Sequence, residues 1–376
     1  MIPSEEQLMI RDAARRFAKE QIAPHAAEWD RQACFPTGVV ANLGTLGFMG
    51  MTIPEDFGGA GADHVSLALA LEEIAVGDAG VATVMSGHNT VGCMPIHRFG
   101  TPEQKERFLK PMARGETLSA FLLTEPQGGS DASNQKTTAR KAGRSYILNG
   151  TKQFVTSGST AQVGIVFAST APDEGANGIS AFIVPTDSPG YRVVREEEKL
   201  GQRSSDTCQI ALDDVEVSDS LRIGEEGEGY RIALSNLEGG RIGIAALSVG
   251  IARAALDAAI PYAKERITFG RPIFEHQAVQ FRLSQMATKL EAARELVLHA
   301  AIMRDAGLPC VKEACMAKLF ASEIAEQVCS DAMQTLGGYG YLKDFPIERY
   351  YRDARVTKIY EGTNDMQCMV IAKHLQ

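Results

Sequence analysis

The pattern of apolar and polar positions divides this chain into a helical first part, a strand-rich centre and a helical last part. Before about residue 118 the apolar spacing is typical of helices. We predict these helices over residues 6–29, 37–46, 64–77, 80–99 and 102–113. Ser4 is predicted to cap the first of them, because a serine side chain can accept a hydrogen bond from a free backbone N–H at the helix start.

After Gly115, short apolar runs alternate with turn residues. This spacing predicts a small antiparallel sheet or barrel of about 100 residues. We expect its strands over residues 119–123, 146–148, 154–156, 163–168, 180–184, 191–194 and 208–217. Asn149-Gly150 lies between two of these runs and predicts a tight hairpin, because both residues tolerate the positive φ that such a turn needs.

From about Ile223 the pattern is helical again. Apolar residues at alternating spacings of four and three predict a seam along one long helix. The seam consists of Val279, Leu283, Met286, Leu290, Ala293, Val297 and Ala300. Because helices with such seams pack as bundles, we predict an α+β chain with an N-terminal all-α domain over 1–118, a central antiparallel β domain over 119–222 and a C-terminal four-helix bundle over 223–376.

Composition narrows the class of protein. An apolar fraction of 44% and a charged fraction of 23% fit a globular protein with a large core. A net charge of −9 argues against a nucleic-acid binder. The seven cysteines and seven histidines are dispersed, so we expect reduced thiols and no metal site. We also expect no membrane span and no targeting segment, hence a cytoplasmic bacterial protein, or a mitochondrial matrix protein if the chain is a processed eukaryotic one.

Candidate chemistry lies near the end of the chain, in Arg352-Asp353-Ala354-Arg355 and Tyr360-Glu361-Gly362-Thr363. A glycine after an acidic residue lets the backbone approach a ligand closely. The carboxylate can then act as a base, while a backbone N–H donates to an oxygen that becomes charged. Residue type alone favours the alternative, a solvated glutamate in a surface turn.

These two strings closely resemble the C-terminal motif of the acyl-CoA dehydrogenase family, in which the glutamate removes the α-proton of an acyl thioester. The resemblance covers essentially the whole chain, because five separate motifs of the family occur in the expected order. It implies the three-domain fold predicted above, FAD as the cofactor and Glu361 as the catalytic base.

Two segments of the β region, 121–131 and 148–156, resemble the flavin-binding segments of the family. The resemblance implies flavin contacts from Phe121, Leu123, Thr124, Gly129, Ser130, Phe154, Val155 and Thr156, with Ser130 also contacting the substrate. The sequence departs from the family at Gly128, where alanine is commoner, and at Phe154, where tryptophan is usual. Phe154 favours short or branched acyl groups. Alone, each segment would be interpreted as a turn or a plain strand.

Leu237-Glu238-Gly239-Gly240-Arg241 is expected to open the first long helix of the last domain. By resemblance, the substrate contacts in the last domain are Glu238, Arg241, Tyr360 and Gly362. Family members that take their base from this helix carry a glutamate at the position of Gly240. Since this chain has glycine there, the role falls to Glu361.

A further set of residues resembles the groups that hold FAD from a neighbouring subunit. They are Arg266, Thr268, Phe269, His276, Gln277, Gln334, Gly337 and Gly338, to which the resemblance adds Thr363 and Asp365 as cofactor contacts. Arginine suits phosphate oxygens because it presents a fixed fork of donors, although Arg266 alone would be interpreted as solvated. Such cross-subunit contacts imply at least a dimer, and the family is typically tetrameric.

The resemblance implies α,β-dehydrogenation of a short, medium or branched acyl-CoA to the 2-enoyl-CoA, in fatty acid β-oxidation or branched-chain amino acid catabolism. Electrons would pass to an electron-transfer flavoprotein. An acyl-CoA oxidase on the same scaffold is an alternative, but oxidases are usually longer. A non-catalytic flavin- or CoA-binding assembly factor would need no base, and a purely structural helical scaffold would leave the glycine-rich loops unexplained.

Overall fold

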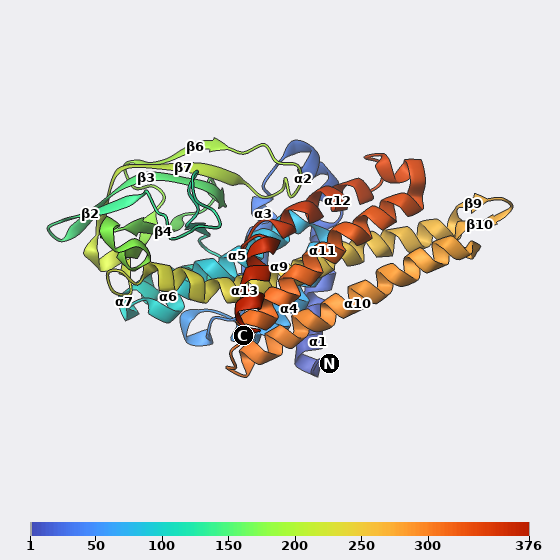
Figure 1. The fold of residues 1–376 in the computed structure, drawn as a ribbon, viewed down its shortest axis with the longest axis horizontal. Coiled ribbons are helices and arrows are strands. Elements are labelled where there is room, and N and C mark those ends of the chain that lie inside the picture. The colour runs from blue at the N-terminus through green and yellow to red at the C-terminus, as the bar shows by residue number, and fades with distance from the viewer. Residues whose placement is uncertain (1, 376) are drawn as a thin grey trace.

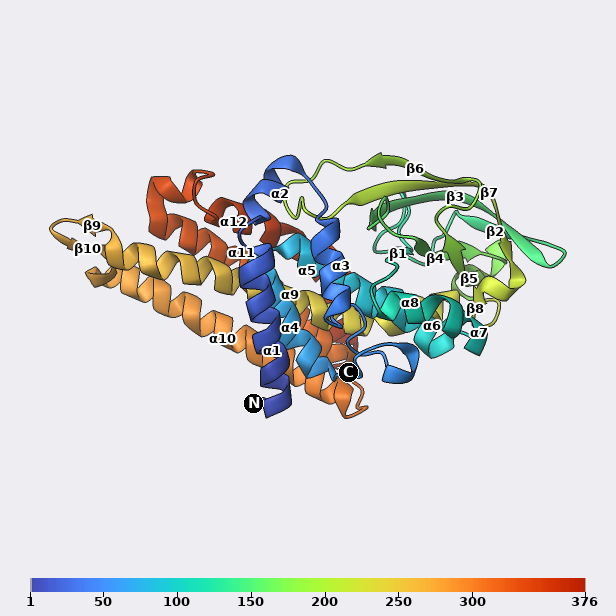
Figure 2. The same cartoon turned by 180° about the vertical axis from the view of Figure 1, so that it is seen from behind.

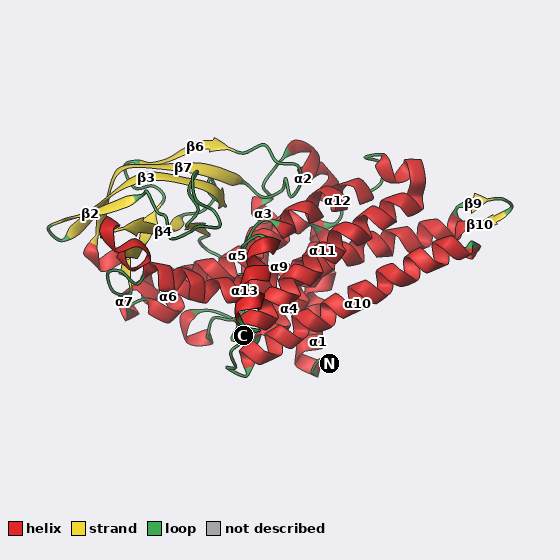
Figure 3. Cartoon of the chain, viewed as in Figure 1, coloured by secondary structure: helices red, strands yellow, loops and turns green. Residues whose placement is uncertain are grey.

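The large sheet and most of the long helices occupy different parts of the molecule in the computed structural model, which describes residues 2–375 (Figures 1 and 3). The sheet lies at one end, and the helices from both ends of the chain pack together in the rest of the molecule. This arrangement confirms the predicted α+β class and the order of helical, β and helical parts.

The N-terminal part is helical as predicted. Its α-helices are α1 (Glu5–Phe17), α2 (Ala26–Gln32), α3 (Thr37–Thr45), α4 (His64–Gly77), α5 (Ala79–Gly87), α6 (Met94–Phe99), α7 (Pro102–Gln104) and α8 (Lys110–Ala113). Ser4 caps α1, and its side chain accepts a hydrogen bond from the backbone of Gln7 (3.2 Å). α4 is buried along almost its whole length because it packs between α1 and α9 (Gly229–Glu265), as the view from behind shows (Figure 2). Its two charged residues, Glu72 and Glu73, pair with Arg253 of α9.

Two helices that the sequence predicted as continuous are interrupted. A π-helical turn over Ala18–Ile22 and a break separate α1 from α2, and a π-helical turn over His88–Cys93 joins α5 to α6. The break before α2 contains Pro24, which has no backbone N–H to continue a helix, whereas the π-helical turn over His88–Cys93 contains no proline.

The central sheet is mixed rather than purely antiparallel. Its strands are β1 (Ser119–Leu122), β2 (Thr138–Ala142), β3 (Ser145–Thr156), β4 (Val163–Ser169), β5 (Ile179–Pro185), β6 (Tyr191–Glu196), β7 (Thr207–Ser218) and β8 (Arg222–Ile223). They follow the order β6-β7-β3-β2-β4-β5-β8, and β1 pairs with β4. The pairs β1–β4 and β2–β4 are parallel, which the long connections between these strands permit.

The hairpin predicted at Asn149-Gly150 is wrong. β3 runs through these residues without turning, and its register with β7 shifts between Leu148 and Gly150, as at a β-bulge. The chain reverses instead at Gly143 (φ 65°), between β2 and β3. Pairing with the 12-residue strand β7 holds β3 straight, and this partner lies too far along the sequence for a local pattern to reveal it.

The last part contains a helical bundle. α9 is followed by the short hairpin β9 (Ile267–Thr268) and β10 (Arg271–Pro272), and then by α10 (Gln277–Asp305), α11 (Val311–Leu336), α12 (Ile347–Arg355) and α13 (Asn364–Lys373). The predicted seam of α10 is buried, apart from a half-buried Val279. α9 is long and apolar enough to cross a membrane, yet 83% of its most apolar window is buried inside the protein.

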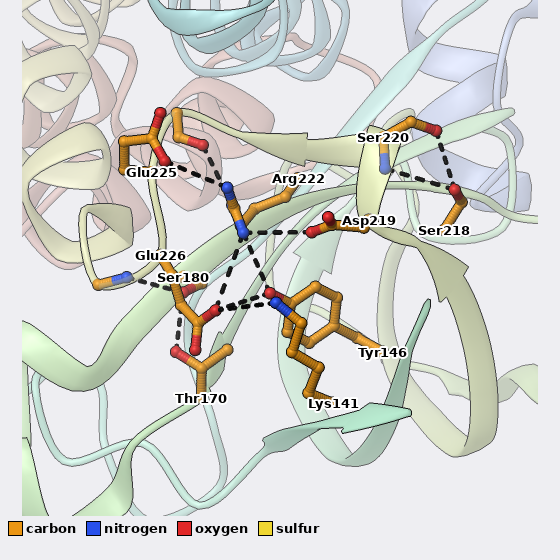
Figure 4. Close-up of polar contacts among 12 residues, drawn as sticks. Lys141, Tyr146, Thr170, Ser180, Ser218, Asp219, Ser220, Arg222, Glu225 and Glu226 are labelled. Atoms are coloured by element: carbon orange, nitrogen blue, oxygen red, sulfur yellow. Dashed lines mark hydrogen bonds and ion pairs between the residues drawn. The ribbon is translucent and has the colours of Figure 1, made fainter. Parts of the chain in front are cut away.

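A polar cluster fixes the start of α9 to the sheet (Figure 4). The guanidinium of Arg222 donates to the Tyr146 hydroxyl (3.0 Å), which in turn donates to the Glu226 carboxylate (2.7 Å). The Ser180 hydroxyl accepts from the backbone N–H of Gly227 (2.9 Å). These contacts attach the connection before α9 to β3 and β5, so they set where the later turns of α9 lie relative to the sheet.

Candidate active site

Glu361 lies in the turn that connects α12 to α13. Its φ is 53°, in the left-handed region that residues with a side chain rarely adopt, and Gly362 follows with φ 83°. The Gln367 side-chain amide donates to the carbonyl oxygens of both residues, at 3.1 and 2.9 Å. Thr363 caps α13 and accepts from the Met366 N–H (3.4 Å). Contacts from α13 therefore hold this turn in a conformation that would otherwise be unfavourable.

The Glu361 carboxylate fills a space that Gly240 of α9 leaves free. A Cβ atom at Gly240 would lie 2.7 Å from Oε1 of Glu361, closer than such atoms approach. The structure thus brings together the two positions that the sequence predicted to be complementary. The motif lies inside α9 rather than at its opening, because the helix begins at Gly229.

The electrostatic surroundings of Glu361 suit a base. Burial raises the pKa of this carboxyl to about 7, although the nearby charges of Arg241 and Lys318 oppose the shift. Its Oε2 atom is buried and has no hydrogen-bond partner among residues 2–375, and the same holds for Nε of Arg241. Buried polar atoms are normally paired, so these two atoms mark a place where a polar ligand group fits.

Lys318 of α11 was missed from the sequence. Its ammonium donates to the Gly362 carbonyl (2.8 Å) and to Oδ1 of Asn364 (2.9 Å). The side chain is fully buried, and burial lowers its pKa to about 8. A lysine among the apolar residues of a predicted core helix was the available signal, because lysine is almost never fully buried without a partner.

The Tyr360 hydroxyl, in the last part of the chain, contacts one residue of the β domain and one of the N-terminal helical part. It lies 3.2 Å from the amide nitrogen of Gln202, in the β6–β7 loop, and 3.2 Å from the hydroxyl of Thr83 in α5. Burial raises the pKa of Tyr360 to about 12, so it remains a neutral phenol. Glu238, one turn before Arg241 on α9, lies 3.5 Å from the Arg304 guanidinium.

The two predicted flavin segments lie side by side in the β domain. The backbone N–H of Gln153 donates to the carbonyl of Thr124 (2.9 Å). Glu125 fixes the loop between β1 and β2, since its buried carboxylate pairs with the buried ammonium of Lys152 (2.8 Å). That pair keeps the pKa of Glu125 depressed, at about 2, against the opposing effect of burial.

These segments expose an apolar ring beside small polar groups. Phe154 has φ 56° and its side chain is 65% exposed, whereas Leu123 and Val155 are buried beneath the surface. Gly129 and Ser130 are exposed, and Phe121, Thr124 and Thr156 are half-buried. An aromatic side chain held out of the sheet by a left-handed backbone offers a face to a flat ring, which fits a flavin.

The remaining cofactor candidates gather around a second site, a hollow of about 530 Å³. Its lining includes Arg266 and Thr268, from the segment after α9, and Gly337 and Gly338, from the turn after α11. Arg266 lies over the Tyr339 ring (5.6 Å to the centroid). A Cβ atom at either glycine would meet nothing within 4 Å, so the backbone is open to a ligand.

The other predicted residues of this group lie nearby, except Thr363 and Asp365, which lie at the start of α13 beside the turn that carries Glu361. A ring nitrogen of His276 lies 3.2 Å from the Thr268 carbonyl, and its ring contacts that of Phe269. Gln277 at the start of α10 and Gln334 near the end of α11 are exposed. Asp365 is also exposed, but it lies in α13, directly after the turn that carries Glu361, which we call the base turn.

The two groups of cofactor candidates lie in different parts of the molecule (Figure 1). The β9–β10 hairpin forms the tip of the helical part, and the sheet that carries the flavin segments lies toward the other end. A ring-binding surface, an arginine fork for phosphate and a glycine-lined hollow together fit the chemistry of FAD. The residues of both groups therefore fit FAD.

Comparisons with known proteins agree with this chemistry. Three family models match: the acyl-CoA dehydrogenase N-terminal domain over residues 4–116, the middle domain over 120–215 and the C-terminal domain over 227–376. An acyl-CoA dehydrogenase of Bacillus subtilis is 50% identical over 99% of this chain and 98% of its own. The short-chain specific acyl-CoA dehydrogenase of Rattus norvegicus mitochondria is 44% identical, over 99% and 90%.

Solved structures match as closely. Butyryl-CoA dehydrogenase from Megasphaera elsdenii superposes with a TM-score of 0.98 at 41% identity, covering 100% of this chain and 99% of that chain. A chain solved in work on the electron transferring flavoprotein of Acidaminococcus fermentans gives a TM-score of 0.99 at 46% identity, with the same coverage. This chain belongs to the acyl-CoA dehydrogenase family and is a FAD-dependent oxidoreductase.

Proposed function

We propose that this enzyme dehydrogenates short-chain acyl-CoA thioesters between the α- and β-carbons, with Glu361 as the base. One observation carries the proposal: a buried carboxylate with a free oxygen and a pKa of about 7, in the space that Gly240 vacates. The short-chain names of the rat relative and the Megasphaera neighbour support the chain length. Phe154, in place of the family's usual tryptophan, also supports a short acyl chain.

In this proposal Glu361 removes the α-proton through Oε2. Its pKa of about 7 makes it a stronger base than an exposed glutamate, while about half of the enzyme remains ionised at neutral pH. Arg241 lies beside the carboxylate and keeps part of it ionised. Bound FAD supplies the acceptor for the hydride that leaves the β-carbon. Ser130, Glu238, Tyr360 and Gly362 are the proposed contacts of the acyl-CoA.

The proposed FAD site is shared between two copies of the chain. Phe121, Leu123, Thr124 and Phe154 of one copy would hold the ring, with Gly129, Ser130, Val155 and Thr156 beside them. The hollow around Arg266, with Thr268, Phe269, His276, Gln277, Gln334, Gly337 and Gly338, would hold the far end of the FAD of the other copy. The separation of these two groups of residues within one chain supports a dimer. The tetramers typical of the family support an assembly of two dimers.

The proposed electron acceptor is an electron-transfer flavoprotein, which the Acidaminococcus neighbour supports. The alternative is an oxidase that passes electrons to O₂. We propose the dehydrogenase because the Bacillus and rat relatives, which match over at least 90% of both chains, are named acyl-CoA dehydrogenases.

The test is a panel of butyryl-, isovaleryl-, octanoyl- and palmitoyl-CoA, each assayed with a dye or an electron-transfer flavoprotein and, separately, with O₂ alone. We expect butyryl-CoA to give the highest kcat/KM and dye reduction to exceed peroxide release greatly. Peroxide formed as fast as dye is reduced would establish the oxidase. Flavin that no acyl-CoA reduces would establish a non-catalytic binder.

A further inference from the structure

Lys318 is a fully buried lysine, and its hydrogen bonds within residues 2–375 lead to Gly362 in the base turn and to Asn364 at the start of α13. Burying an ammonium group is costly unless it is hydrogen-bonded. Two of its donors are satisfied by the Gly362 carbonyl and the Asn364 side chain. Asn364 is itself held by the hydroxyl of Ser322, one turn further along α11 (3.0 Å). The cost of burial is therefore met by contacts that connect α11 to the turn.

The turn needs such contacts. Glu361 and Gly362 both have left-handed backbone angles, and a residue with a side chain is strained in that region. Without tethers the turn would relax and the carboxylate would move away from Gly240. Gln367 supplies neutral hydrogen bonds from α13, and Lys318 supplies a charged one from α11.

We propose that Lys318 is a positioning residue for the dehydrogenation: its buried ammonium fixes the turn that carries Glu361. The proposal rests on the proposed role of Glu361 as the base. Lys318 acts through Glu361 rather than on the substrate, because its ammonium donates to the backbone carbonyl of Gly362, the residue after Glu361.

The charged groups around the carboxylate give the expected direction of the pH effect. Arg241 of α9 and Lys318 of α11 face Glu361 and lower its pKa, whereas burial raises it to about 7. Lys318 itself faces Arg241, Glu361 and Cys315. Removing the Lys318 charge leaves burial opposed by Arg241 alone, so the Glu361 pKa must rise and the base is protonated over a wider pH range.

The experiment compares Lys318→Met, Lys318→Gln and Lys318→Arg by anaerobic flavin reduction from pH 6 to pH 10. Lys318→Met is expected to reduce the limiting rate by about 10²-fold, because small misplacements of a catalytic group cost that much, and to move the midpoint to higher pH. Lys318→Gln keeps a donor without the charge, so the midpoint moves but the rate at high pH falls less. Lys318→Arg keeps the charge, and its midpoint stays close to that of the wild type.

A second readout does not depend on turnover. Titration of the Glu361 carboxyl by difference infrared spectroscopy, against Glu361→Gln as the blank, is expected to show the same upward shift in Lys318→Met. The matched control is Lys358→Met, which removes a lysine three residues before Glu361. Lys358 pairs with Glu326 (2.9 Å) and is expected to change neither the rate nor the midpoint.

Wild-type rate and midpoint in Lys318→Met would overturn the inference. If that variant does not fold, Asn364→Ala removes the acceptor that holds the ammonium, and a wild-type profile in it would overturn the inference equally. Failure of the base assignment is distinguishable: Glu361→Gln would then reduce its flavin normally. If Glu361→Gln is inert and the Lys318 variants behave as wild type, only the role of Lys318 is wrong.

Discussion

The base turn and the hollow around Arg266 differ in how much of each site one chain supplies. The base turn is held by side chains from α11 and α13, and Tyr360 ties it to α5 and the β6–β7 loop. The hollow, in contrast, is open: Phe269, next to the lining residue Thr268, is 96% exposed, and the two lining glycines face open space. One chain holds the proposed base in position by itself, whereas in our proposal FAD and a second copy of the chain complete the hollow.

Glu361→Gln tests the base turn and has the largest expected effect. The substitution keeps the shape of the side chain but removes the base, and general base catalysis contributes roughly 10²–10⁴-fold. We expect flavin reduction by butyryl-CoA to slow by that factor while FAD content stays unchanged. Stopped-flow absorbance of the flavin under nitrogen measures it. Bleaching at the wild-type rate would show that another group takes the proton.

Gly240→Ala asks whether the room beside the carboxylate is essential. A methyl group would lie within 3 Å of all three terminal atoms of Glu361 and push the carboxylate away. We expect the rate of flavin reduction to fall by about 10²-fold, with FAD retained. Gly239→Ala is the control, because its Cβ would lie no closer than 3.4 Å to any neighbour. Equal rates in the two variants would remove the steric argument.

Arg266→Ala tests the hollow that this arginine lines. If its guanidinium binds phosphate oxygens of FAD across a subunit boundary, its loss should weaken FAD binding by roughly 10- to 100-fold and weaken the oligomer with it. Equilibrium dialysis of FAD and sizing with and without FAD measure both. Arg271→Ala is the control, since this exposed arginine of the same hairpin does not line the hollow.

A hybrid oligomer sharpens this prediction. One chain carries Arg266→Ala and the other Glu361→Gln, with different tags for purification. A site shared between subunits then contains one intact combination, so activity should return above that of either variant alone. A stable wild-type monomer that holds its full complement of FAD would contradict the shared site.

The smallest expected effect is the pH dependence of the wild-type enzyme. Burial raises the pKa of Glu361 to about 7, and the base acts in its ionised form, so the rate of flavin reduction should rise with pH and reach half its maximum near pH 7. Between pH 8 and pH 6 the rate should fall about 10-fold. A profile that is flat down to pH 5 would show an ordinary exposed carboxylate at this step.

The sequence was most informative where a local pattern decides the structure. The seam of α10, the cap at Ser4 and the alternation of helical and strand-rich parts were all predicted from spacing. Asn149-Gly150 failed because the same dipeptide fits a turn and a bulge, and pairing with the distant strand β7 decides between them.

In the candidate site, too, contacts between distant parts of the chain could not be predicted from local patterns. Motifs identified Glu361 and Gly240, but only the fold shows that their atoms compete for one space. Lys318, Gln202 and Thr83 belong to no short motif and reach the turn from three distant elements. Spacing along the chain carries no information about such contacts, because the packing of α5, α11 and the β6–β7 loop creates them.

The central claim, that Glu361 removes the α-proton, is tested most directly without hydride transfer. An acyl-CoA with sulfur in place of the β-carbon has no hydride to give, so only exchange of its α-hydrogens can occur. In D₂O we predict that the wild-type enzyme exchanges them for deuterium, followed by mass spectrometry, and that Glu361→Gln does not. Exchange in Glu361→Gln as fast as in the wild type would contradict the account.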